Sequence, residues 1–83
     1  MKGITIDRDE NYAEMEISSV FYPREVIEET TNEFRDICNF RIEKRGERTA
    51  INFTPKADVP IEILTYEFVN HLLANLKNRR GVM

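Results

Sequence analysis

The sequence is poor in cysteine, tryptophan, glycine and proline. It has 83 residues, with one cysteine, no tryptophan, three glycines and three prolines. The single cysteine, Cys38, cannot form an internal disulfide. This cysteine usage suits a reducing compartment, and we expect a cytoplasmic protein.

Long hydrophobic runs are also lacking. No stretch reaches the roughly 18 consecutive apolar residues that a membrane-spanning helix needs, so we expect no membrane partner. The first ten residues, MKGITIDRDE, contain a lysine but no apolar segment of the kind found in a secretory signal. With 41% hydrophobic and 33% charged residues, the chain is typical of a folded globular protein, and 1–83 is expected to be a single domain.

The excess of charge is small. A formal net charge of −3 disfavours unspecific nucleic-acid binding, which depends on a positive surface. Basic residues do occur, and they are Lys44, Arg45, Arg48, Lys56, Lys77, Arg79 and Arg80. Among the strand aromatics, Phe40 and Phe53 alternate in step with Ile42 and Ile51, so they are expected on the same buried face of the sheet. This predicts core residues rather than aromatic rings on which nucleic-acid bases stack. A weak nucleic-acid binder therefore remains only an alternative.

Two regions alternate in the manner of strands. In the first, Ile4 and Ile6 share one parity, and from Tyr12 to Ile17 apolar residues alternate with Glu14 and Glu16. The second runs from Phe40 to Phe53, with a turn at residues 45–47 around Gly46. Each region predicts a hairpin, and Pro55 is expected to end the last strand.

Two stretches have the spacing of helices. An amphipathic helix is predicted from Pro23 to about Cys38, with Cys38 on its apolar side. A second is predicted from Asp58 or Val59 to Arg80, with Asp58 as a possible N-cap and Gly81 as a stop. The order β-β-α-β-β-α predicts an α+β fold, with a four-stranded, mainly antiparallel sheet and two helices on one face.

The sequence contains no clear catalytic, cofactor-binding or metal-ligating set. His71, the only histidine, follows Glu67 by one helical turn, so the pair forms the best enzymatic alternative. A surface role on the helix is the simpler interpretation of His71. Asp7, Asp9 and Glu10 lack the spacing and the glycine of a calcium loop, and no small-molecule ligand is evident.

The final helix carries more apolar residues than one buried stripe requires. Its apolar arc exceeds the roughly 100° that covering a sheet needs, which predicts either a homodimer or another protein partner. We expect the contact to use Tyr66, Val69, Asn70 and Leu73. The acidic face of the first helix, with Glu29 and Glu33, is either solvated or a second contact for a basic partner.

Several stretches resemble a known family. The motifs are Val20–Ile27, Phe34 with the strand Phe40–Glu43, Ile51–Lys56, and Glu67–Leu73 followed by arginines. From Ala13 to Arg80 the chain is similar to the HxsD proteins of the His-Xaa-Ser peptide-modification systems. That family is associated with radical-SAM maturases, so the resemblance implies an accessory binding protein and defines no catalytic residues. We therefore expect a non-catalytic protein-binding module that acts through its C-terminal helix.

Overall fold

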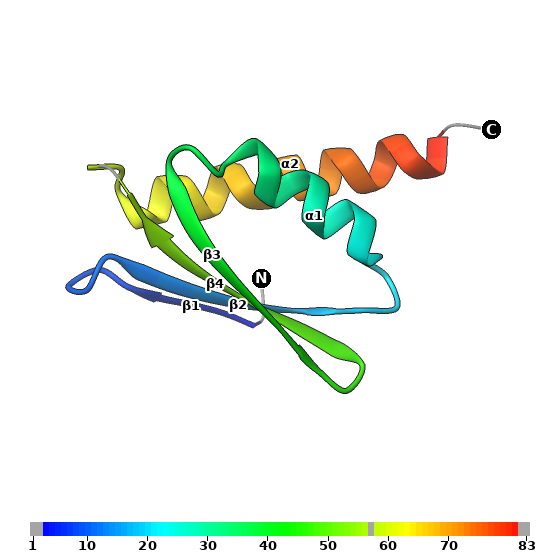
Figure 1. Cartoon of the computed structure of the whole chain (residues 1–83), viewed down its shortest axis with the longest axis horizontal. Coiled ribbons are helices and arrows are strands. Elements are labelled where there is room, and N and C mark those ends of the chain that lie inside the picture. The colour runs from blue at the N-terminus through cyan, green and yellow to red at the C-terminus, as the bar shows by residue number, and fades with distance from the viewer. Residues whose placement is uncertain (1–2, 57, 82–83) are drawn as a thin grey trace.

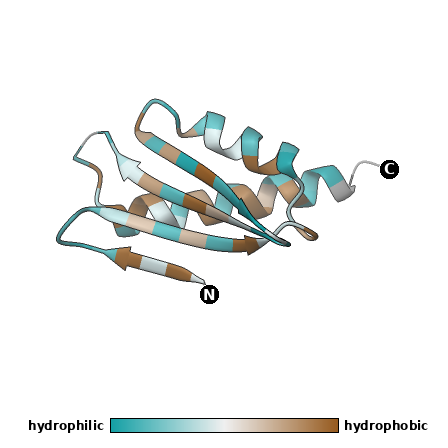
Figure 2. Ribbon diagram, turned by 60° about the horizontal axis from the view of Figure 1, so that its bottom comes forward, coloured by the Kyte–Doolittle hydropathy of each residue, from teal (hydrophilic) through white to brown (hydrophobic). Residues whose placement is uncertain are grey.

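The computed structural model describes residues 3–56 and 58–81. They form four strands and two helices in the predicted order (Figure 1). The elements are β1 (Ile4–Asp7), β2 (Tyr12–Ser18), α1 (Arg24–Glu33), β3 (Cys38–Arg45), β4 (Arg48–Pro55) and α2 (Ile61–Gly81). The α+β class, the antiparallel sheet and the placement of both helices on one face are confirmed (Figure 2).

The four strands lie in the order β1-β2-β4-β3, and every neighbouring pair is antiparallel. Each hairpin therefore occupies one half of the sheet, and β2 and β4 join the halves at its centre. Met15 of β2 pairs with Ile51 of β4 there, and both side chains are fully buried. Helix α1 carries the chain from β2 to the opposite edge of the sheet, where β3 begins (Figure 1).

The core lies between the sheet and the helices, and aromatic rings fill much of it. Phe68 of α2 is at its centre, with ring centroids 4.7 Å from Phe53, 5.3 Å from Phe40 and 5.5 Å from Phe34. The alternation in β2 is confirmed, because Ala13, Met15 and Ile17 are buried while Glu14 and Glu16 face the open side. This packing fixes which side of α2 faces inward.

Helix α1 is shorter than predicted, and Cys38 does not belong to it. The helix ends at Glu33, and the N–H groups of Ile37 and Cys38 both donate to the carbonyl of Phe34, at 3.1 and 2.9 Å. These tight turns redirect the chain, so Cys38 becomes the first residue of β3 and pairs with Pro55. Ile37 and Cys38 continue the apolar spacing of the helix past its true end, which explains the error.

Helix α2 begins later than predicted, at Ile61 rather than at Asp58 or Val59. The residue before a proline is pushed out of the helical conformation, and Val59 precedes Pro60. The carbonyl of Pro60 accepts the N–H of Leu64 at 3.1 Å, so Pro60 rather than Asp58 is the residue at the helix boundary. Gly81, the predicted stop, is the last residue of the helix.

Candidate functional site

Apolar side chains of α2 also lie outside its buried stripe. We call Ile63, Tyr66, Val69, Asn70 and Leu73 the α2 outer face. Tyr66 is 68% exposed, Ile63 56% and Leu73 43%, while Val69 is half-buried against the core. The structure thus brings together the four residues of α2 that the sequence predicted as a contact, and Ile63 joins them.

The exposure follows from the geometry of the helix. Ile61, Leu64, Phe68 and Leu72 form the buried stripe, and each is at most 2% exposed. Residues in a helix are about 100° apart, so Tyr66, Val69, Leu73 and Leu76 fall on a neighbouring stripe. Their spacing of three and four residues is that of a coiled-coil seam. Val69 and Leu76 of this stripe still pack against the core, whereas Tyr66 and Leu73 are exposed.

Charged residues stand at the two ends of this stripe. Glu62 lies in the first turn of α2 and Lys77 near its last turns, about four turns apart on the same side of the helix. Glu62 forms an exposed ion pair with Arg8 at 3.0 Å. The face therefore combines an apolar middle with an acidic start and a basic end.

The predicted acidic face of α1 is exposed and also makes contacts with α2. Glu33 accepts a hydrogen bond from the side chain of Asn75 at 3.2 Å, and Glu29 lies 3.8 Å from Arg79. Both carboxylates remain 40–49% exposed, so they line the border between the two helices rather than a fully solvated face. Whether they also contact a partner remains a prediction.

His71 also belongs to this helix–helix border. Its Nδ1 lies 3.2 Å from Oε1 of Glu33, and its ring meets Phe34 edge-on with centroids 5.0 Å apart. The carboxylate that orients it is therefore Glu33 of α1, and the expected partner Glu67 is not the one it contacts. Two hollows on the surface of the described residues, one beside α1 and the other at Thr5–Asp9, do not include His71.

Cys38 is fully buried at the start of β3. Its thiol donates to the carbonyl of Asn39 at 3.3 Å. Burial raises the pKa of Cys38 from 9.0 to about 11, against smaller opposing effects from the backbone of Thr54 and the charge of Lys56. A protonated, inaccessible thiol is a poor nucleophile, so the predicted packing role fits this environment.

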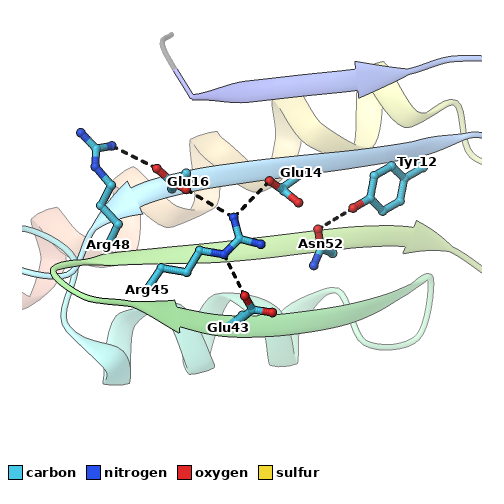
Figure 3. A network of polar contacts seen from close by, with 7 residues as sticks. All are labelled: Tyr12, Glu14, Glu16, Glu43, Arg45, Arg48 and Asn52. Atoms are coloured by element: carbon cyan, nitrogen blue, oxygen red, sulfur yellow. Dashed lines mark hydrogen bonds and ion pairs between the residues drawn. The ribbon is translucent and has the colours of Figure 1, made fainter.

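The open face of the sheet carries a network of ion pairs (Figure 3). Arg45 lies 2.8 Å from Glu43, 3.5 Å from Glu16 and 3.7 Å from Glu14. Arg48 also reaches Glu16, at 3.6 Å. These contacts cover Ala50, which is fully buried beneath them.

The same face shows why the aromatic residues do not form a stacking platform. Phe53 is buried and Phe40 half-buried on the helix side of the sheet. Tyr12 does lie on the open face, where its hydroxyl donates to Asn52 (Figure 3). With Arg45 and Arg48 already paired to carboxylates, the nucleic-acid alternative gains no support from this surface.

One further surface was missed by the sequence analysis. A pocket of about 380 Å³ opens between the start of α1 and the second half of β3, and Ile42 lines it. Ile42 was expected in the core because of its parity, yet it is 45% exposed, since β3 is an edge strand there. The adjacent apolar residues Val20 and Phe21, 70% and 60% exposed, were the available signal.

Among residues 3–56 and 58–81, no cluster of three or more histidine, cysteine, aspartate or glutamate side chains could hold a metal ion. Neither described helix combines the length and the apolar character needed to cross a membrane. Comparisons with protein-family models, curated proteins and solved structures found no match to this chain.

Proposed function

We propose that this domain is a non-catalytic protein-binding module that acts through the α2 outer face, and that this face binds a second copy of the chain. The exposure of Tyr66 and Leu73 carries the proposal, because the core-facing stripe of α2 is already complete without them. Contiguous exposed apolar side chains on a small domain typically mark an association site.

Antiparallel pairing of two α2 helices makes the face self-complementary. A two-fold axis near Val69 and Asn70 places Tyr66 of each copy against Leu73 of the other. Glu62 then lies opposite Lys77 of the second copy at both ends of the seam. In an antiparallel pair, the positive end of each helix dipole also lies beside the negative end of the other. Apolar contact, charge and helix orientation therefore all favour this arrangement.

A dimer would also offset the small size of the domain. A chain of this length buries only about 60–65% of the surface that its unfolded state exposes. Covering the α2 outer face in a second copy would add apolar burial without enlarging the core. The resemblance to HxsD proteins supports an accessory role for such a dimer beside a radical-SAM peptide-modifying enzyme, with Glu29 and Glu33 available to a basic partner.

The test is the solution mass, measured by light scattering after gel filtration at two concentrations. We expect a dimer that dissociates on dilution and that the double variant Tyr66→Ala with Leu73→Asp converts to a monomer. Phe21→Ala, which removes another exposed aromatic ring elsewhere, serves as the control and should leave the dimer intact. A monomeric wild type at both concentrations would contradict the proposal.

A charge swap tests the antiparallel arrangement itself. Glu62→Lys and Lys77→Glu should each weaken the dimer, because each places like charges opposite one another. The two substitutions together should restore it. If the combined variant is no tighter than either single variant, the two helices do not pair in this register.

A further inference from the structure

The sheet has two edges of unequal length. β1 closes one edge and has four residues, whereas β3 forms the other edge and has eight. Within the described residues, β3 pairs only with β4. A long edge strand presents a row of unpaired backbone groups, to which another strand can be added.

The turn after β3 determines which backbone groups face outward. Gly46 and Glu47 form a two-residue loop between the paired residues Arg45 and Arg48, and Gly46 has φ +64. A loop of this kind is flanked by a hydrogen-bonded pair, so Arg45 directs its N–H and C=O toward β4. At the other end of β3, the N–H of Lys56 donates to the carbonyl of Ile37 at 2.9 Å. Ile37 is also odd-numbered, so this bond agrees with odd-numbered residues directing their backbone groups toward β4.

Among the even-numbered residues of β3, Cys38 already donates its N–H to the carbonyl of Phe34. The others, Phe40, Ile42 and Lys44, therefore direct their backbone groups to the open edge. Their side chains lie on the helix side of the sheet, since Phe40 packs against Phe53 and Phe68. All three residues thus offer free backbone groups at the edge, and Phe40 and Ile42 also offer apolar surface on the helix side of the sheet.

The pocket beside α1 adjoins this edge. Its apolar lining comes from Tyr22, Ile27 and Ile42, and its polar lining from Ser19, Arg24, Glu28, Lys44 and Thr49. The loop that carries Tyr22 also exposes Val20 and Phe21. A residue added opposite Ile42 would project to the same side of the sheet as Ile42, and so toward the pocket. The volume of about 380 Å³ accommodates an apolar side chain there.

The charges along β3 indicate what kind of segment fits. Arg45 and Glu43 neutralise one another, but among the described residues no ion pair joins Arg41 or Lys44 to a carboxylate. Arg41 lies on the open face and Lys44 on the pocket side. An added strand with acidic residues opposite both would complement these charges.

We infer that β3 binds an extended peptide segment as an additional antiparallel strand. An apolar residue of the peptide enters the pocket beside Ile42, and acidic residues face Arg41 and Lys44. A second copy of the domain fits this edge less well, because α1 lies on the β3 side of the sheet and would meet its own symmetry mate (Figure 2). Strand addition is an established mode of peptide recognition.

A fluorescent peptide tests the site directly. The probe is Ser-Glu-Lys-Val-Glu-Val-Thr, whose central valine lies opposite Ile42 and whose glutamates lie opposite Lys44 and Arg41. We expect saturable fluorescence anisotropy with a Kd below about 1 mM, weakening as salt is added. Lack of saturable binding to the folded protein would overturn the inference.

Matched N-methyl peptides test whether the peptide adds as a strand. Methylation of the central valine nitrogen removes an N–H that faces β3, and should reduce affinity at least tenfold. Methylation of the glutamate that follows removes an N–H on the far side, and should leave affinity within about twofold. Equal effects of the two methyl groups would show that the peptide does not pair with β3.

Protein variants separate this site from the α2 outer face. Ile42→Pro removes an N–H that points away from β4, so it should abolish binding while the fold is retained. Ile42→Val is the control that keeps the N–H, and Tyr66→Ala should bind the peptide normally. A dimer that Ile42→Pro converts to a monomer would instead assign the edge to a second copy and overturn the peptide inference.

Discussion

The side-chain oxygen of Asn11 accepts a hydrogen bond from the backbone N–H of Ile61 at 3.2 Å. Asn11 lies in the turn between β1 and β2, and Ile61 is the first residue of α2. The first N–H groups of a helix have no partner within the helix, so the turn of the first hairpin satisfies a group that α2 cannot satisfy itself. The exposed ion pair between Arg8 and Glu62 lies at the same junction.

Substitution of Asn11 should reveal the value of this contact. Asn11→Gly removes the hydrogen bond but tolerates the backbone φ of 51, and should lower the free energy of unfolding by about 1 kcal/mol. Asn11→Ala also places a side chain in the left-handed conformation, and should cost about 1 kcal/mol more. Urea unfolding followed by circular dichroism measures both. Equal losses in the two variants would show that backbone strain contributes nothing.

Phe68 should be the most sensitive position in the core. It contacts three other phenylalanine rings, and it is fully buried. Phe68→Ala should lower the free energy of unfolding by about 4 kcal/mol, through lost burial and the resulting cavity. Phe68→Leu fills more of the space and should unfold at an intermediate urea concentration. Phe21→Ala, at a 60% exposed ring, should change stability by no more than about 0.5 kcal/mol.

Two glycines with positive φ should differ in their tolerance of alanine. At Gly46, with φ +64, an added Cβ meets no atom within 4 Å, so only the backbone conformation is strained, at about 1 kcal/mol. At Gly3, with φ +87, the Cβ would lie 2.8 Å from the carbonyl oxygen of Glu16. The N–H of Glu16 donates to the Gly3 carbonyl at 2.8 Å, so relief of that clash would break a sheet contact. Thermal unfolding should show a larger loss for Gly3→Ala than for Gly46→Ala, and the reverse order would contradict this account.

The Cys38 thiol should make stability depend on pH in alkaline solution. Its pKa is raised from 9.0 to about 11 by burial, so between these values the folded state retains a proton that the unfolded state loses. The contribution to stability is therefore complete below about pH 9 and declines as pH rises toward 11. Urea unfolding of wild type and Cys38→Ala from pH 7.5 to 10.5 should show a steeper decline for wild type. Parallel curves would refute the shift.

Much of the fold could be predicted because its signals are local. The strict alternation around Met15 identified β2, and Gly46 identified the second turn, since both depend on neighbouring residues in the sequence. The end of α1 could not be predicted in this way, because the apolar spacing continues to Cys38 while tight turns redirect the chain. Ile42 was misplaced for a related reason: parity gives the face of the sheet but not the distance from its edge.

Contacts between distant segments account for the remaining differences. Sequence spacing paired His71 with Glu67 on the same helix, whereas tertiary packing brought Glu33 of α1 to the ring. The cap supplied by Asn11 likewise comes from fifty positions away in the chain. The residues expected on the α2 outer face were identified more easily, because the excess of apolar side chains on one helix is itself a local pattern.

The pairing of β2 with β4 has a consequence for how the chain folds. Both hairpins and both helices can form from neighbouring residues, but this central ladder joins segments on either side of α1. Closing that long loop costs entropy before any contact repays it, so it should be the slow step of folding. During synthesis on the ribosome, the apolar side of β2 emerges well before β4. The nascent chain must therefore keep Ala13, Met15 and Ile17 from aggregating until the second hairpin arrives.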